Sequence, residues 1–166
     1  MEPRSTNLDI YQVAADGSSA PVNLTAANHA TDTLPAASPD GKYLAYAAMA
    51  RPTYEADRQV LMLRDLATGT VRALTEGWDR SVGSIAWTPD SKAIIVTAQD
   101  LLEHPAFSVD VKGGKVTRLT TRGNVFDTVP MAGGAMVHAL NSIAAPTDII
   151  LRDAKGQARN LSNSNA

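Results

Sequence analysis

Short runs of alternating apolar and polar residues, separated by turn residues, fill most of the chain. One unit shows the pattern clearly, because Tyr43–Tyr46 and Val60–Leu66 have the composition of strands and residues 70–75 follow as a third. The tight connection at residues 67–69 predicts a hairpin loop. Proline presets φ in a turn, aspartate can bond its own backbone, and glycine accepts a positive φ. The turn that opens the unit has this composition: Ser38, Pro39, Asp40 and Gly41.

The unit recurs along the chain, and the recurrence predicts the fold. A Leu-Thr or Leu-Ser pair closes each unit. The leucines of these pairs follow one another at intervals of 50, 45 and 42 residues: Leu24, Leu74, Leu119 and Leu161. The opening turn recurs with Pro89 and Asp90 in place of Pro39 and Asp40, and in a weaker form at residues 131–134. A repeat of roughly 40–45 residues with about four strands is typical of a β-propeller blade.

The repeats predict an all-β fold, a partial β-propeller of about three and a half four-stranded antiparallel blades over residues 1–166. The half blade covers residues 8–25, and the whole blades cover residues 33–75, 82–120 and 125–162. Propellers have about 4–8 blades, so we expect a segment of a larger propeller. A four-bladed ring whose half blade is completed from elsewhere is the alternative.

Composition narrows the functional classes. The net charge of −2 gives no electrostatic footprint for nucleic acid or an anionic membrane. No run of 18 apolar residues predicts a membrane-spanning helix, and Met1–Arg4 leads into a polar stretch instead of a secretory leader. The absence of cysteine excludes disulfides and thiol catalysis.

Few residues suggest catalysis or metal binding. The histidines His29, His104 and His138 are widely separated and have no second ligand at metal-binding spacing, so we expect turn or surface histidines, no metal and no cofactor. The chain has no Gly-x-Ser-x-Gly motif, and we assign no catalytic residue. Glycines at 113–114 are expected in a hairpin turn.

An insertion at residues 48–59, AMARPTYEADRQ, lengthens the first whole blade. One interpretation is a solvated loop whose charges pair locally, each exposed pair contributing at most about 1 kcal/mol. The other is a recognition loop, in which Glu55 or Asp57 offers a carboxylate to a cationic group and Tyr54 offers a flat apolar wall. Arg58 completes the set of substrate-binding candidates. Farther on, Trp78 is expected to pack between blades.

Several stretches resemble a known family. SPDGKYLAYA and WTPDSKAIIVTA resemble the repeat shared by TolB-type propellers, which are WD40-like, and by the propellers of prolyl oligopeptidase-family (S9) serine peptidases. RPTYEADRQVLMLRD, LTEGWDRSVGSIAWTPDSK and LNSIAAPTDIILRD are similar to the dipeptidyl-peptidase and acylaminoacyl-peptidase branch. The resemblance implies the C-terminal half of a propeller that is followed by a catalytic α/β-hydrolase domain absent from this chain.

In such enzymes the propeller caps the active site and filters peptide substrates by size. Acidic propeller residues of some relatives hold the free amino terminus of the substrate, and Glu55 is the candidate here, although the paired-glutamate motif of the best-known dipeptidyl peptidases has no match. The implied partners are peptide substrate and the hydrolase domain, and the implied location is periplasmic or secreted, with the cytoplasm left open.

Two other functions stay open. One is a TolB-like scaffold module with no enzymatic parent, and the other is a sugar- or lactone-cleaving propeller with a central metal. A half propeller would also expose a strand edge in each outer blade and two uncovered blade faces, so we expect the isolated chain to self-associate.

Overall fold

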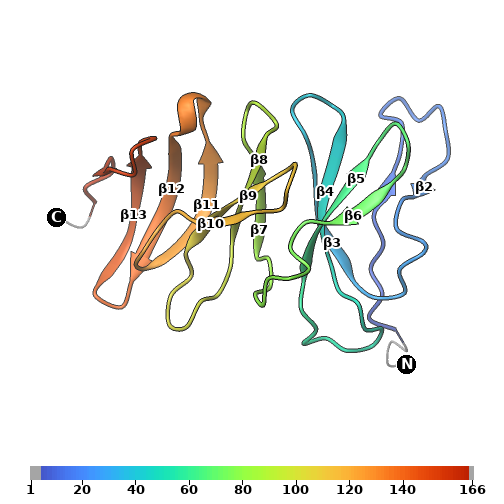
Figure 1. Cartoon of the computed structure of the whole chain (residues 1–166), viewed down its shortest axis with the longest axis horizontal. Helices are drawn as coiled ribbons and strands as arrows, with labels where there is room; N and C mark the ends of the chain where they lie inside the picture. Colours follow the sequence, from blue (N-terminus) through green and yellow to red (C-terminus); the bar gives the residue numbers. More distant parts are fainter. Residues whose placement is uncertain (1–4, 165–166) are drawn as a thin grey trace.

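The computed structural model describes residues 5–164, which form four antiparallel sheets side by side in an arc (Figure 1). The expectation that Met1–Arg4 does not begin a secretory leader concerns residues outside the described part of the chain. The same holds for the ends of the predicted domain, residues 1–4 and 165–166. Within them, no helix has the length and hydropathy needed to span a membrane.

Each sheet follows the chain, and neighbouring strands in sequence are neighbours in the sheet. The first sheet has two strands, β1 (Tyr11–Gln12) and β2 (Val22–Asn23). The second contains β3 (Asp32–Ala37), β4 (Tyr43–Ala48), β5 (Val60–Asp65) and β6 (Val71–Ala73). The third contains β7 (Ser84–Trp87), β8 (Ala93–Thr97), β9 (Ala106–Asp110) and β10 (Val116–Arg118). The fourth contains β11 (Asn124–Pro130), β12 (Met136–Ser142), β13 (Ala145–Arg152) and β14 (Ala158–Asn160).

The all-β propeller fold predicted from the repeat is confirmed, with local differences. The strands of the first sheet are shorter than the predicted apolar runs, although a bond from the Leu24 N–H to the Ile10 carbonyl (2.8 Å) continues their pairing. The one helix in the described part of the chain is a short 3₁₀ turn, η1 (Ala132–Gly134), in the weakly matched third opening turn. Residues 54–58 and 100–104 form no helix.

The opening turns owe their shape to the residues that mark them in the sequence. The Ser38 hydroxyl donates to Asp40 Oδ1 (2.6 Å) and accepts the N–H of Tyr43 (2.9 Å), while Gly41 has φ of 72°. In the next blade Thr88 and Asp90 repeat the bond at 2.8 Å. The carboxylate in each turn therefore accepts hydrogen bonds from within its own turn, including the N–H of Lys42 or Lys92.

The closing Leu-Thr or Leu-Ser pair extends the ladder between the third and fourth strands of each blade. In all four sheets its hydroxyl accepts a backbone N–H from the next-to-last strand or the residue just before it, at 2.9–3.0 Å, and the leucine N–H donates back to the carbonyl of that same residue at 2.8 Å. The pairs are Thr25 with Ile10, Thr75 with Leu61, Thr120 with Ala106, and Ser162 with Ile149.

Apolar side chains pack between consecutive sheets. The largest cluster joins the second and third sheets, where the ring of Trp78 meets Phe107 edge-on at 4.9 Å between centroids. The indole N–H of Trp87 donates to the carbonyl of Ala36 across the same junction (2.9 Å). Trp78 thus occupies the place between blades that the sequence predicts for it.

The outer face of the fourth sheet is exposed. Ile10, Leu61 and Ala106 are at most 7% exposed because the next sheet covers them, whereas the equivalent Ile149 is 40% exposed. Leu161, which directly follows β14, is 43% exposed. This face has the composition of a blade junction without a covering sheet among the described residues.

Candidate functional site

The loops lie on two opposite edges of the arc. The opening turns and η1 lie along the upper edge in Figure 1, and the connections between second and third strands lie along the lower edge. The insertion predicted at residues 48–59 follows directly from β4, which includes Ala48, and its residues 49–59 connect β4 to β5 on the lower edge. Its counterparts in the next two blades span residues 98–105 and 143–144, so the lower edge is most elaborate in the second sheet.

Asp57 organises the insertion from inside. Its Oδ2 accepts the backbone N–H groups of Ala50 (2.9 Å) and Arg51 (2.8 Å), and its Oδ1 accepts the Arg51 Nε–H (2.8 Å). The Arg51 side chain, with these backbone donors, lowers the pKa of Asp57 to about 2. The Arg51 guanidinium also lies 4.0 Å from the centroid of the Tyr54 ring. Asp57 therefore holds the loop, and one face of Tyr54 is covered.

Arg58 ties the insertion to the connection between the second and third sheets. Its guanidinium donates to the carbonyls of Glu76 (2.8 Å) and Trp78, and pairs with the Glu76 carboxylate at 3.3 Å. Glu55 is exposed and makes no hydrogen bond or ion pair with the rest of residues 5–164. Of the four predicted binding residues, Glu55 is the one whose charged group is available to a ligand.

A cavity of about 380 Å³ lies beneath the insertion, between the first and second sheets. Apolar side chains form most of its wall, among them Ala48, Met49 and Met62. The polar and charged lining residues are Thr25, Asn28, Asp32, Tyr46, Arg64 and Glu76. Met49 and Ala50, at the start of the insertion, are among its lining residues.

Asp32 is the unusual group in this cavity. Its side chain is 3% exposed. Oδ1 accepts the side-chain amide of Asn28 (3.0 Å). Burial raises the pKa of Asp32, against the opposing effect of hydrogen bonds from the side chains of Asn28 and Thr25. Burial, followed by the charge of Asp32, raises the pKa of Tyr46. Sequence reasoning missed Asp32, although alignment of the repeats would have found it.

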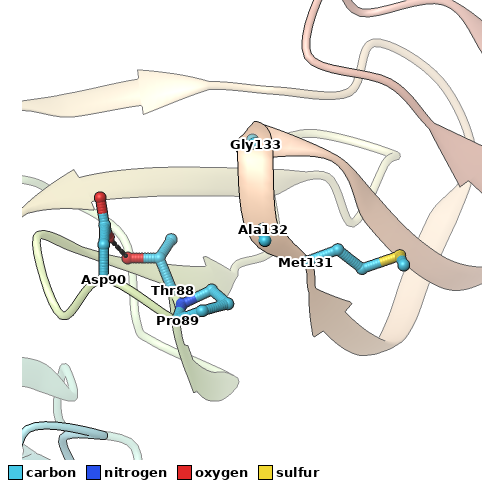
Figure 2. A pocket seen from close by; sticks show the side chains of 7 residues that line it. Thr88, Pro89, Asp90, Met131, Ala132 and Gly133 are labelled. Atoms are coloured by element: carbon cyan, nitrogen blue, oxygen red, sulfur yellow. Dashed lines mark hydrogen bonds between the residues drawn. The ribbon is translucent and has the colours of Figure 1, made fainter.

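A second cavity, of about 330 Å³, lies on the opposite edge between two opening turns. Figure 2 shows Thr88, Pro89 and Asp90 on one side and Met131 to Gly133 on the other. Asp90 already accepts the Thr88 hydroxyl, which holds the pKa of Asp90 below its usual range. This site therefore has a carboxylate that is committed to a turn, and no neighbouring nucleophile or base.

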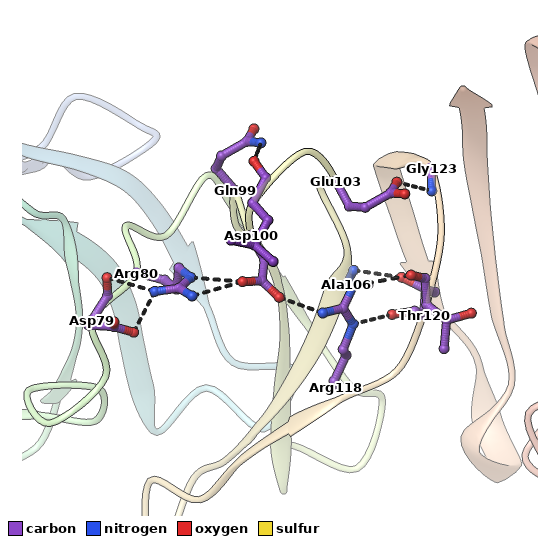
Figure 3. Close-up of polar contacts among 11 residues, drawn as sticks. Asp79, Arg80, Gln99, Asp100, Glu103, Ala106, Arg118, Thr120 and Gly123 are labelled. Carbon is purple, nitrogen blue, oxygen red and sulfur yellow. Dashed lines mark hydrogen bonds and ion pairs between the residues drawn. The ribbon is translucent and has the colours of Figure 1, made fainter. Parts of the chain in front are cut away.

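Ion pairs brace the connection between β8 and β9 (Figure 3). Asp100 lies between Arg80, at 2.8 Å, and Arg118, and Glu103 accepts the N–H of Gly123. These contacts fix the base of a turn whose tip, Leu101–Leu102, is almost fully exposed. Asp100 pairs with both arginines and Glu103 accepts a backbone N–H, so these charged groups serve the loop rather than an acid-base site.

The histidines do not form a site. The expectation of turn or surface histidines is wrong for His138, which is 3% exposed within β12 because its strand position faces the neighbouring sheet. Burial, with the charge of Arg152, lowers the pKa of His138. Among residues 5–164, no group of three or more His, Cys, Asp or Glu side chains could hold a metal ion.

Two curated relatives match most of the chain. Dipeptidyl-peptidase 5 from Porphyromonas gingivalis is 32% identical over 145 residues, 87% of this chain and 21% of the relative. The probable dipeptidyl-peptidase 5 from Emericella nidulans is 35% identical over 138 residues, 78% of this chain and 19% of the relative. The chain thus spans about a fifth of the length of these relatives. No protein-family model matches it.

Solved structures match the fold. A TolB protein from Agrobacterium tumefaciens superimposes with a TM-score of 0.72 over 93% of this chain and 56% of its own, at 20% identity. The acylaminoacyl peptidase from Pyrococcus horikoshii gives a TM-score of 0.68 over 93% of this chain and 22% of its own, at 15% identity. At these identities the likeness shows a shared propeller architecture.

Proposed function

The chain is homologous over most of its length to a segment of dipeptidyl-peptidase 5, a serine peptidase of the prolyl oligopeptidase family, and we propose that it serves as the propeller part of such an enzyme. The observation that carries the proposal is the 32% identity over 87% of the chain, combined with a propeller fold. The alternative of a scaffold module rests on fold likeness at 20% identity alone.

In this proposal the chain contributes substrate selection and no bond chemistry. Each carboxylate in the insertion other than Glu55, and each one in the opening turns, is engaged by its own loop. Within residues 5–164, no group of three or more His, Cys, Asp or Glu side chains could hold a metal ion. The acyl-transfer machinery would belong to an α/β-hydrolase domain packed against the propeller, and the purified chain alone should cleave no peptide.

The insertion would be the substrate-binding element. Glu55 presents a free carboxylate and follows Tyr54, which is 50% exposed, on a loop that Asp57 and Arg58 hold in place. A carboxylate on a braced loop is suited to the ammonium group of a peptide amino terminus. Tyr54 would contact the first side chain of that peptide.

A chimera tests both parts of the proposal. The matching 145-residue segment of the Porphyromonas gingivalis dipeptidyl-peptidase 5 is replaced by the equivalent residues of this chain, and dipeptide release is measured. We expect the folded chimera to retain activity, and Glu55→Gln to raise KM for substrates with a free amino terminus while kcat stays nearly constant.

The control is Asp16→Asn, which removes an exposed carboxylate in the turn between β1 and β2 and should leave KM unchanged. A folded chimera without activity would contradict the proposed function. An active chimera with the same KM in the Glu55→Gln variant would retain the function and remove Glu55 from substrate binding.

A further inference from the structure

The hairpin between β8 and β9 ends in two leucines that are almost entirely exposed. Leu101 is 87% exposed and Leu102 is 89% exposed. Leu101 also has a φ of 56°, in the left-handed region that favours glycine and that costs free energy for a bulky side chain. Neither the exposure nor this backbone conformation stabilises the chain, so its folding does not explain the leucine pair.

The base of the hairpin is nevertheless firmly held. Asp100 and Glu103 each donate the backbone N–H to the carbonyl of the other, at 2.9 and 3.1 Å. The Asp100 carboxylate pairs with Arg80, from the connection before β7, and with Arg118 in β10. Glu103 accepts the backbone N–H of Gly123 (Figure 3). A braced hairpin presents its apolar tip to a partner without the entropy cost of ordering a flexible loop.

The position of the tip limits what can cover it. The third sheet packs against the second on one side and against the fourth on the other, so a further blade at either end of the arc would not cover the two leucines (Figure 1). Ile143, in the equivalent connection of the fourth sheet, is fully exposed as well. Both tips lie on the lower edge, together with the insertion. The partner that covers them therefore lies outside the row of blades.

The charges beside the tip favour a protein partner over a membrane. Two carboxylates, Asp100 and Glu103, stand beside two guanidinium groups, Arg80 and Arg118. This balance provides no attraction to anionic lipid, and binding of a protein to a membrane through an apolar tip is usually reinforced by basic residues. A pair of leucines on a fixed hairpin instead matches an apolar groove on a protein surface.

The proposed function identifies which protein surface lies on that edge. The insertion, as the substrate-binding element, holds the peptide on the lower edge, so the domain that cleaves the peptide must approach from the same side. The matching 145 residues are 21% of the Porphyromonas gingivalis relative, which leaves ample length for such a domain. We propose that Leu101 and Leu102 insert into an apolar groove of the α/β-hydrolase domain and anchor it to the third blade, an inference that rests on the proposed function.

Cysteine labelling tests this anchor, because the chain has no cysteine of its own. Leu102→Cys is made in the isolated chain and in the chimera with the Porphyromonas gingivalis dipeptidyl-peptidase 5. The rate of maleimide modification at this position is measured by mass spectrometry of the peptide that contains it. We expect the rate to be at least about tenfold lower in the chimera, because docking buries the thiol and only local opening exposes it.

Two further variants serve as controls. Lys112→Cys lies in the exposed turn after β9, beside the opening turns on the upper edge, and should be modified equally fast in both proteins. Leu101→Asn removes an apolar anchor but keeps a residue that tolerates a positive φ, so it should not lower the urea midpoint of the isolated chain. In the chimera it should raise the labelling rate of Leu102→Cys toward that of the isolated chain.

Equal labelling of Leu102→Cys in the isolated chain and in an active chimera would overturn the anchor and leave the proposed function standing. A folded, inactive chimera in which Leu102→Cys is protected would contradict the proposed function and still support docking, so the two proposals can fail separately. Labelling of the isolated chain that is slow and becomes faster on dilution would assign the leucines to a second copy of this chain. Flotation of the isolated chain with phosphatidylcholine and phosphatidylglycerol vesicles would assign them to lipid, and either result would overturn the proposal.

Discussion

At the scale of single residues, two aspartates of one blade illustrate how surroundings set their roles. Asp57 accepts three N–H bonds, two from backbone and one from Arg51, and its pKa falls. Asp32 accepts one amide hydrogen in a buried position, and its pKa rises. The first carboxylate is therefore stabilising when ionised, and the second is destabilising when ionised.

The Asp57 contacts predict an acid-sensitive insertion. Its folded pKa of about 2 lies below the ordinary value of 3.8, so the stabilisation is complete above about pH 4 and is lost as pH falls through about 2. In an NMR titration, the Ala50 and Arg51 amide resonances should shift with a midpoint near pH 2. Asp57→Asn should abolish this transition. A midpoint near the ordinary value would show that the Arg51 contacts are absent in solution.

Replacing Asp32 by valine, which stands at the equivalent position of the next two blades, should stabilise the protein. Asp32→Val removes a carboxylate whose charged form is disfavoured by burial, and we expect the free energy of unfolding at pH 7 to rise by roughly 1–3 kcal/mol in urea denaturation. Because the folded pKa of Asp32 is raised, the gain should shrink as pH falls toward 3.8. Val82→Asp, the reverse change in the next blade, should destabilise. A destabilised Asp32→Val variant would instead make this carboxylate structural.

At the scale of the element, the hydroxyl of each Leu-Thr or Leu-Ser pair joins the last two strands of its blade by accepting a backbone N–H. The bond is the same in all four sheets, but its surroundings differ, because Thr75 is 2% exposed and Ser162 is exposed. A hydrogen bond that is shielded from water is costly to lose, since water cannot replace the missing partner. We therefore expect the buried bond of Thr75 to contribute more to the free energy of unfolding than the exposed bond of Ser162, although their geometry is the same.

A pair of substitutions measures this difference. Thr75→Val keeps the shape but leaves the buried Leu61 N–H without its acceptor, and should lower the free energy of unfolding by about 1–3 kcal/mol. Ser162→Ala exposes the equivalent N–H to water and should cost less than about 1 kcal/mol. Equal losses in chemical denaturation would contradict the argument from burial.

At the scale of the whole molecule, the repeat in the sequence predicts where each blade begins and ends, but contacts between different sheets could not be predicted from it. The turn at Ser38 and the Leu-Thr pair at Leu74 each form within one blade, so they mark the boundaries of the blade and the order of its strands. The partners of Arg58 lie 18–20 residues away, in the connection to the next sheet, and no local pattern reveals them. The burial of Asp32 and His138 likewise arises from packing between sheets.

The exposed face of the fourth sheet predicts self-association. Ile149 and Leu161 occupy positions that are covered in the preceding blades, so we expect concentration-dependent association in sedimentation velocity. The double variant Ile149→Lys with Leu161→Lys should shift the chain toward monomer. Leu102→Lys, at an exposed loop tip on another surface, should leave association unchanged. A wild type that stays monomeric at high concentration would contradict this expectation.

Both tryptophans of the chain lie at the junction of the second and third sheets, Trp78 against Phe107 and Trp87 bonded to Ala36. Tryptophan fluorescence therefore reports on the junction of the second and third sheets. A parting of these two sheets would change the emission, whereas loosening of the β11–β14 hairpins could proceed without a spectral signal. Emission and circular dichroism recorded on the same sample would then separate opening of this junction from melting at the end of the arc.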